Sequence, residues 1–291
     1  MITLRLGKKR YMMPTRWSEL SPEDGAKFVS LCKAAGDFES GRITYEQLQV
    51  STVLILLGLE KINPEEDGYK FENIYRLSRY TDGFFPVTST DEGQTATAAV
   101  CMTENLLPKI GNFTGYRFRI HDGGVVDCDL RAEQYVDALS LMNEYNQTFN
   151  PITLRSLCQC LYVLPYDSLK SYDVDLHFSE AEQLAVYYNF RGILEYIKRI
   201  PSYDLIFRGS EKRQGPASPL GMSGTLFGIA KAGYGDIESI RKLDLFSYLG
   251  ILVQMTVDSI KALAASKLKP GEIADKLSLE VEQVVPYLAG T

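Results

Sequence analysis

The chain has 291 residues, of which 45% are apolar and 23% charged, a composition typical of a folded globular protein. Its formal net charge of −6 argues against nucleic acid or anionic membrane as a partner, because such binding requires clustered Lys and Arg. The length allows either one large domain or two domains of ordinary size.

Cysteine usage and hydropathy favour a soluble cytoplasmic protein. The five cysteines are odd in number and irregularly spaced, which indicates reduced thiols rather than a disulfide framework. The first residues are followed by Gly7 to Arg10, where a signal peptide would need an apolar stretch. The longest uncharged apolar runs, 47–59 and 245–257, have 13 residues each. Because they are too short to span a membrane, we expect both to be buried helices.

The N-terminal sixty residues predict a small β-hairpin followed by two helices. Residues 2–6 and 10–13 alternate as paired strands do. A Ser cap, a proline and acidic residues predict a helix from Ser21 to about Ala35. A second helix should begin after Thr44 and end at Gly58.

The segment from about 63 to 129 is predicted to be an irregular, partly β insert, because prolines and glycines interrupt it repeatedly. Within it, residues 69–80 predict a helix. Residues 97–102 and 116–120 predict strands. The small polar residues of 88–97 predict a mobile loop.

Helical periodicity dominates after residue 130. Apolar residues recur at helical spacing over 135–145, 154–162 and 179–197, which predicts three amphipathic helices. Residues 209–224 are rich in Gly, Ser, Pro and charge, and predict a linker. Residues 225–291 then predict a smaller helical unit.

The predicted fold class is therefore mainly α. A helical bundle-like body over 1–208 carries the N-terminal hairpin and the irregular insert, and the linker joins this body to the C-terminal helical unit.

Three patterns that could carry chemistry are each better explained by structure. Cys158 and Cys160 do not have C-x-x-C spacing, and on a helix they would point about 200° apart. Asp173, Asp175 and His177 alternate as metal ligands on a strand could, but no second cluster partners them. No nucleophile elbow, zinc-binding helix or phosphate loop is present. We therefore predict no enzyme activity and no catalytic, cofactor-binding or metal-binding residue.

Residues 270–286 have the apolar spacing and the central turn of a helix-turn-helix motif. The second helix would offer Glu280, Glu282 and Gln283 to DNA, with no Arg or Lys among them. A structural helical pair is favoured, and a DNA-binding regulator remains as an alternative.

The chain is rich in aromatic residues, with 18 Tyr and 13 Phe. Core packing is the safer interpretation for each one, although Tyr and Trp are also frequent at interfaces. Our candidates for partner binding are Trp17, Tyr187, Tyr188, Phe246 and Tyr248.

Four motifs occur in an order that resembles a family encoded in tail gene clusters of Bacteroidetes phages and prophages. They are the hairpin with its Pro-x-x-Trp-x-Glu-Leu continuation (2–24), TENLLPKI (103–110), the helical segment 130–165 and the closing helical segment 226–252. The chain departs from the family near Met222, where the family usually carries a Trp. Its helical pair after Pro270 is additional.

This family resembles tail assembly chaperones, so the resemblance implies a non-enzymatic phage tail morphogenesis protein that acts through protein–protein contacts. The implied location is the host cytoplasm. The implied partners are phage tail proteins, the tape-measure protein among them, and self-association is left open. The alternative is a structural virion component, such as a neck or tail accessory protein. The resemblance implies no catalytic residues.

Overall fold

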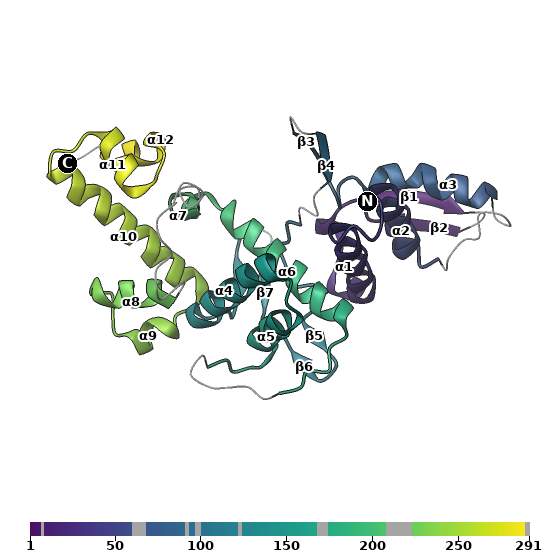
Figure 1. Ribbon diagram of the computed structural model, residues 1–291, viewed down its shortest axis with the longest axis horizontal. Coiled ribbons are helices and arrows are strands. Elements are labelled where there is room, and N and C mark those ends of the chain that lie inside the picture. The colour runs from purple at the N-terminus through teal and green to yellow at the C-terminus, as the bar shows by residue number, and fades with distance from the viewer. Residues whose placement is uncertain are drawn as a thin grey trace. The chain divides into compact units, whose positions relative to one another are not determined.

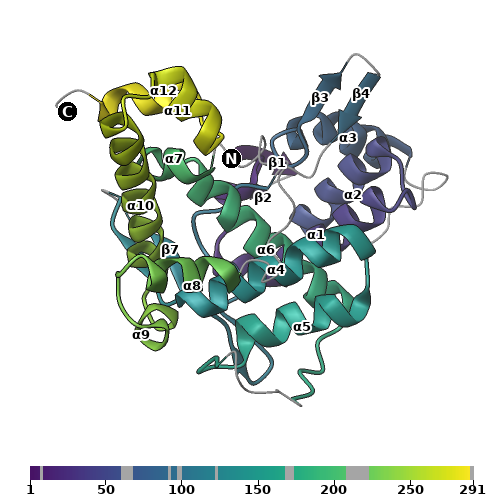
Figure 2. The same ribbon diagram turned by 60° about the vertical axis from the view of Figure 1, so that its left-hand side comes forward.

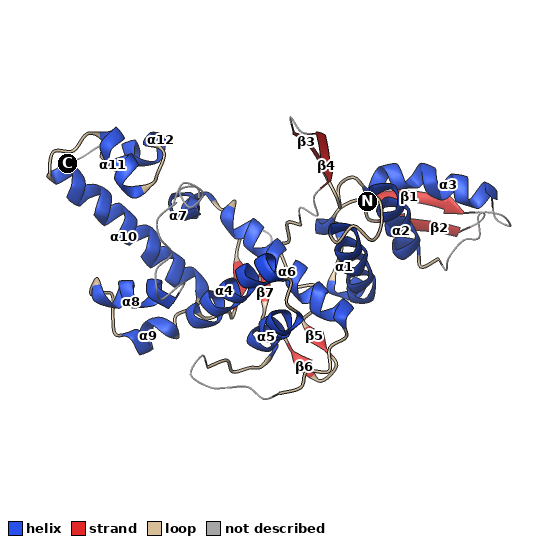
Figure 3. Cartoon of the chain, viewed as in Figure 1, coloured by secondary structure: helices blue, strands red, loops and turns tan. Residues whose placement is uncertain are grey.

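The computed structural model of the chain describes the residues in the following ranges: 1–6, 9–59, 68–90, 93–96, 100–121, 124–167, 174–207 and 223–288. Within these ranges the protein is mainly helical, with short two-stranded sheets, which confirms the predicted fold class (Figures 1 and 3).

Contacts divide the chain into two compact units. The first comprises Met1–Gly115, Arg119–Gly124 and Val174–Glu195, and the second comprises Tyr116–Phe118, Val125–Asp173 and Tyr196–Thr291. This division differs from the predicted boundary at 208/209. The reason is that the helix over 132–148 contacts the helices over 223–231, 237–241 and 245–265.

The first unit begins with the predicted hairpin. Strands β1 (Ile2–Leu6) and β2 (Lys9–Met13) pair antiparallel, with Ile2 opposite Met13. The side chain of Met13 is fully buried. The predicted turn at Gly7-Lys8 lies outside the described residues.

Three helices follow: α1 (Gly25–Glu39), α2 (Tyr45–Leu57) and α3 (Gly68–Ser78). The start of α2 is as predicted, because the Thr44 hydroxyl accepts the Gln47 N–H at 3.3 Å and leaves one fewer amide unpaired. Its end is also as predicted, because Gly58 takes the left-handed conformation that favours glycine. Helix α1 runs four residues beyond the predicted Ala35. Figure 1 shows α1 and α2 side by side.

Trp17 anchors the core of the first unit. Its indole N–H donates to the carbonyl oxygen of Phe84 at 2.7 Å. Its ring makes edge-to-face contacts with Phe28 of α1, Phe84 and Phe85. Each such pair contributes about 0.5–1.5 kcal/mol beyond its burial. The segment that follows α3 is thereby held against the N-terminal helices.

The predicted mobile loop over 88–97 is wrong within the described residues. Strands β3 (Val87–Thr90) and β4 (Gly93–Ala96) form an antiparallel hairpin there, with Thr88 opposite Thr95. Thr has a high β-propensity because it is β-branched, and this propensity was underweighted against the polar composition of the segment.

The strands predicted around 97–102 and 116–120 are only partly present. Residues 97–99 lie outside the described residues, and 100–102 belong to no strand. The Met102 amide donates instead to the Gly192 carbonyl of a helix at 2.9 Å. The second predicted strand is shorter, as β7 (Phe118–Ile120). The remaining short strands are β5 (Lys109–Ile110), β6 (Phe113–Thr114) and β8 (Val126–Cys128).

The three amphipathic helices predicted after residue 130 are confirmed as α4 (Ala132–Thr148), α5 (Pro151–Tyr162) and α6 (Glu180–Lys198). In the second unit α4 and α5 lie against each other (Figure 2). The division between the two units falls inside α6.

The C-terminal segment is helical, as predicted. Its elements are α7 (Asp204–Phe207), α8 (Ser223–Lys231), α9 (Ile237–Arg241), α10 (Leu245–Ala265), α11 (Pro270–Leu277) and α12 (Val281–Val284). Most of the predicted linker, up to residue 222, lies outside the described residues. Ile260 of α10 and Ile273 of α11 lie in a core that also takes Leu205 of α7.

Helix α10 is long and apolar enough to cross a membrane by length and composition alone, with a mean hydropathy of 1.2 in its most apolar window. Only 22% of that window is buried. A core helix of a soluble protein passes the same test, and Ile260 of α10 is indeed fully buried. The absence of a membrane segment therefore stays a prediction.

The surroundings of two helical glycines, Gly192 and Gly250, predict opposite effects of a change to alanine on stability. A Cβ added at Gly192 would lie 2.8 Å from a methyl carbon of Val100 and 2.9 Å from Met102 Cγ, whereas no described atom lies within 4 Å of one added at Gly250. We expect Gly192→Ala to lower the free energy of unfolding by about 1–3 kcal/mol through overpacking. Gly250→Ala should raise it by about 0.5–1 kcal/mol through helix propensity. Urea unfolding of both variants measures the difference, and equal effects would contradict the packing at Gly192.

Candidate functional site

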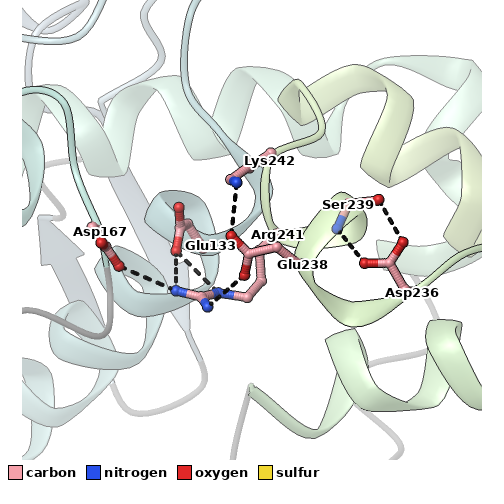
Figure 4. A network of polar contacts seen from close by, with 7 residues as sticks. All are labelled: Glu133, Asp167, Asp236, Glu238, Ser239, Arg241 and Lys242. Atoms are coloured by element: carbon pink, nitrogen blue, oxygen red, sulfur yellow. Dashed lines mark hydrogen bonds and ion pairs between the residues drawn. The ribbon is translucent and has the colours of Figure 1, made fainter.

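The densest cluster of charged side chains that the structure describes lies where α9 meets α4 (Figure 4). The Arg241 guanidinium donates through Nη2 and Nε to one carboxylate oxygen of Glu133, at 2.7 and 3.2 Å. Asp167 lies 3.4 Å from the same Nη2, and Glu238 lies 3.2 Å from Nη1. The side chains of Arg241 and Glu133 are 12% and 5% exposed.

The local sequence of α9 explains how Arg241 is positioned in this cluster. Asp236 caps α9, because its carboxylate accepts the Ser239 N–H at 3.0 Å and the Ser239 hydroxyl at 2.7 Å (Figure 4). Arg241 then falls in the last turn of α9, where a cation is favoured by the helix dipole. Burial lowers the pKa of Arg241, but the hydrogen bond and charge of Glu133 outweigh this, so the net pKa is raised. The guanidinium stays charged and fixes α9 against α4.

A second polar group lies one turn further along α4. The Tyr166 hydroxyl donates to Asp137 Oδ2 at 2.7 Å. Burial raises the pKa of Asp137, and the neighbouring Glu133 adds to the rise, while Tyr166 and Arg241 oppose it. Burial also raises the pKa of the Cys160 thiol, with a contribution from Asp137.

These groups are poorly suited to nucleophilic catalysis. Burial raises the pKa of Cys128 to about 12, and the pKa values of Cys32 and Cys158 are also raised by burial. A reactive cysteine needs the opposite environment, because the thiolate is the attacking species. The chemistry that the cluster supports best is a structural ion pair between helices.

The histidines are found on the surface. His121 is exposed, and His177 pairs through Nδ1 with Asp175 at 3.1 Å, with the imidazole 81% exposed. Asp173, the third member of the alternating pattern, lies outside the described residues. Among the residues that are described, no group of three or more His, Cys, Asp or Glu side chains could hold a metal ion.

The five aromatic candidates for partner binding are placed mainly in the core. Trp17, Tyr187, Tyr188 and Tyr248 are at most 5% exposed, and only Phe246 is half-buried. The Tyr188 hydroxyl donates to Glu39 at 2.7 Å, and the Tyr248 hydroxyl shares a 2.7 Å hydrogen bond with Thr225. Packing within the chain covers the helical faces that carry four of these rings, and their role in partner binding stays a prediction.

A surface that our sequence reasoning missed lies at the turn from α4 to α5. Phe149 is 69% exposed and Ile152 is 72% exposed, and the ring of Phe149 stacks edge-on against Tyr145 at 5.9 Å. Phe149 has a φ of 50°, in the left-handed region that a bulky residue rarely adopts. We name Tyr145, Phe149 and Ile152 the aromatic corner. The sequence signal for this surface was an apolar residue, Phe149, at the end of a helix and immediately before Asn150-Pro151.

A second uncovered apolar surface is a groove between α1 and α2. Its volume is about 550 Å³. The apolar residues that line it include Val29, Leu54, Ile55 and Leu59, and Lys27 and Lys33 are among its polar lining residues. We name it the α1–α2 groove.

The C-terminal helical pair has the predicted arrangement. Ser278, in the left-handed conformation, separates α11 from α12, and Leu279 is buried between them. Val281 of α12 is 41% exposed, and Val285, in the 3-10 turn that follows α12, is 50% exposed. Glu282 is also exposed. Acids and valines at these positions do not suit the contacts that read DNA bases.

Comparisons with protein-family models, with curated proteins and with solved structures give no match to this chain. The family resemblance therefore remains a prediction from the four motifs.

The burial of the Glu133–Arg241 pair predicts that losing Glu133 lowers stability more than losing Lys242, which belongs to an exposed pair. We expect Glu133→Gln to lower the free energy of unfolding by about 1.5–3 kcal/mol, because it removes a charge-assisted hydrogen bond while leaving Arg241 buried. Lys242→Ala removes an exposed ion pair with Glu238 and should change stability by less than about 0.5 kcal/mol. Chemical denaturation of both variants measures this, and equal losses would refute the structural role.

The raised pKa of Asp137 predicts that replacing it with a neutral residue changes stability in a pH-dependent way. Its raised pKa in the folded state means that folding prefers the protonated carboxyl, so this group lowers stability at neutral pH. Asp137→Asn should therefore raise the melting temperature at pH 7, since the amide oxygen can still accept from Tyr166. The gain should shrink as pH falls through the folded pKa. It should vanish below about 3.9, the usual aspartate value. A gain that is constant with pH would contradict this.

Proposed function

We propose that this protein is a non-enzymatic phage tail morphogenesis protein that acts as an assembly chaperone through protein–protein contacts. The four ordered motifs of the sequence supply the link to phage tails. The observation that carries the mode of action is the aromatic corner, an apolar surface that remains exposed at the turn between two well-packed helices.

The composition and the backbone of the aromatic corner both support docking. Tyr145 and Phe149 are aromatic, and aromatic side chains are enriched in the fully buried centres of interfaces. A left-handed Phe costs the folded chain about 1–3 kcal/mol, and strain of this kind is found most often at functional sites. In a partner complex, burial of Phe149 and Ile152 would each contribute about 1.5–3 kcal/mol.

The same surface suits a chaperone for a long helical client such as a tape-measure protein. Such a client exposes apolar helical faces before it assembles, and a chaperone needs only to cover them. It needs neither a metal nor a reactive thiol. A structural virion component would use the same contacts, so location distinguishes the two: mass spectrometry should detect a component, but not a chaperone, in purified virions.

We expect Phe149→Asn to abolish copurification with a tape-measure protein, the client that the resemblance implies, when the two are co-expressed. Asn tolerates the left-handed backbone, so the fold should be retained while the ring is lost. Ile152→Gln should weaken the complex at least tenfold, which corresponds to about 1.4 kcal/mol.

Gln147→Ala, an exposed change on α4 near the corner, serves as the matched control and should leave the complex intact. The melting temperature of each variant checks the fold. The proposal fails if the wild-type chain forms no complex and phage without this gene still build tails.

A further inference from the structure

The basic residues of this chain are unevenly distributed. The first 18 residues contain five Lys and Arg and no Asp or Glu, whereas the rest of the chain has 26 Lys and Arg against 37 Asp and Glu. The formal net charge is therefore +5 in this short segment and −11 elsewhere. Four of the five cations fall within positions 5–10, where β1 ends and β2 begins. The overall charge of −6 thus conceals a local cluster of the kind that phosphate binding requires.

The register of the hairpin assigns its two faces (Figure 1). Paired residues lie on the same side of a two-stranded sheet, and successive pairs alternate between the two sides. The Ile2–Met13 pair is on the inner face, because Met13 is fully buried and β2 contacts α2. The next pair, Thr3–Met12, is on the outer face, where Thr3 is exposed and Met12 is 60% exposed.

The outer face places two arginines opposite each other. Arg5 pairs with Arg10 in the register, two positions along from the Thr3–Met12 pair. Arg10 is exposed, and among the described residues no acidic side chain forms an ion pair with it. Like charges directly opposite each other on a sheet repel, so this pair by itself weakens the hairpin. A bound anion would remove the repulsion.

We propose that the outer face of the β1–β2 hairpin binds the phosphate backbone of nucleic acid. A guanidinium can donate two parallel hydrogen bonds to phosphate oxygens, and Lys9, beside Arg10 in β2, adds a further cation. The major groove of duplex DNA admits a two-stranded β-ribbon. The clustered lysines favour phosphates over an acidic protein, because lysine is depleted in the centres of protein–protein interfaces.

This binding goes beyond the proposed function. It uses neither the aromatic corner nor a tail protein, so either idea can fail without the other. The acidic remainder of the chain repels nucleic acid, so the contact is confined to the hairpin and depends strongly on salt. Each phosphate neutralised on duplex DNA contributes about −0.9 to the slope of log K against log salt, so four cations give a slope of up to about −3.6.

Fluorescence anisotropy of a labelled DNA duplex of about 20 base pairs, titrated with the full chain from about 50 to 200 mM salt, tests the proposal. The wild type should bind with a dissociation constant of about 1–100 μM, as sequence-independent contacts do. Arg5→Thr with Arg10→Thr keeps β-formers in the strands and removes two cations. This variant should bind about tenfold more weakly or worse, with a slope reduced by about 1.8.

Arg76→Gln with Lys261→Gln is the matched control, because it removes two exposed cations elsewhere and changes the net charge equally. It should leave both the affinity and the slope unchanged. The melting temperature of the hairpin variant should not fall, because the repulsion between opposed arginines is gone. A wild type that does not bind the duplex at low salt overturns the proposal, as does an equal loss of affinity in the two variants.

Two further measurements separate the kind of anion and the effect of folding. Poly-glutamate and vesicles of phosphatidylserine, added as competitors at equal charge, should displace the duplex less well than unlabelled DNA does. Equal displacement by poly-glutamate would indicate an acidic protein partner, and equal displacement by vesicles a membrane, and either result overturns the proposal. Arg10→Glu replaces the repulsion by attraction to Arg5, so a folded chain carrying it should still lose DNA binding. Binding that this variant retains also overturns the proposal.

Discussion

The contacts of Trp17 are the constraint on which the first unit depends. A single indole donates to the backbone at Phe84 and packs its ring against α1, so it ties the segment that follows α3 to the N-terminal helices. With one side of α1 held in this way, its opposite side and the partly exposed turn of α2 remain to form the α1–α2 groove. The groove therefore lies on the side of α1 that the Trp17 core does not cover.

The second unit is held together by a different combination of forces. Helices α4 and α5 pack through apolar faces, but the short helix α9 buries only Ile240 completely. The Glu133–Arg241 ion pair fixes the orientation of α9 on α4, because a planar guanidinium binds a carboxylate in only a few geometries. A buried pair of this kind is weak evidence for stability and better evidence for a specified arrangement of helices.

The aromatic corner and the α1–α2 groove have the same physical origin. Apolar surface that a folded chain leaves uncovered costs free energy in water, and exposed patches on soluble proteins commonly mark interaction sites. The aromatic corner combines exposed apolar side chains with a left-handed backbone at Phe149, which suits burial against a partner. The α1–α2 groove is a hollow lined by apolar side chains together with Lys27, Lys33 and Asp37.

The sequence by itself determined the local elements. Thr44 and Asp236 cap their helices because a side-chain oxygen can satisfy a nearby amide, and Gly58 ends α2 because it lacks a Cβ. Helical periodicity likewise located α4, α5 and α6. These outcomes depend on residues within a turn or two of each other, so the amino-acid order is sufficient to predict them.

Only the tertiary structure decided which faces are covered. The spacing of Tyr188 and Tyr248 shows that they are on apolar helical faces, but not that both faces meet other helices of the same chain. The pairing of Glu133 with Arg241 joins residues 108 positions apart, and no local pattern specifies it. Burial and long-range pairing depend on how helices pack in three dimensions, so the apolar side chains that stay exposed could be found only in the structure.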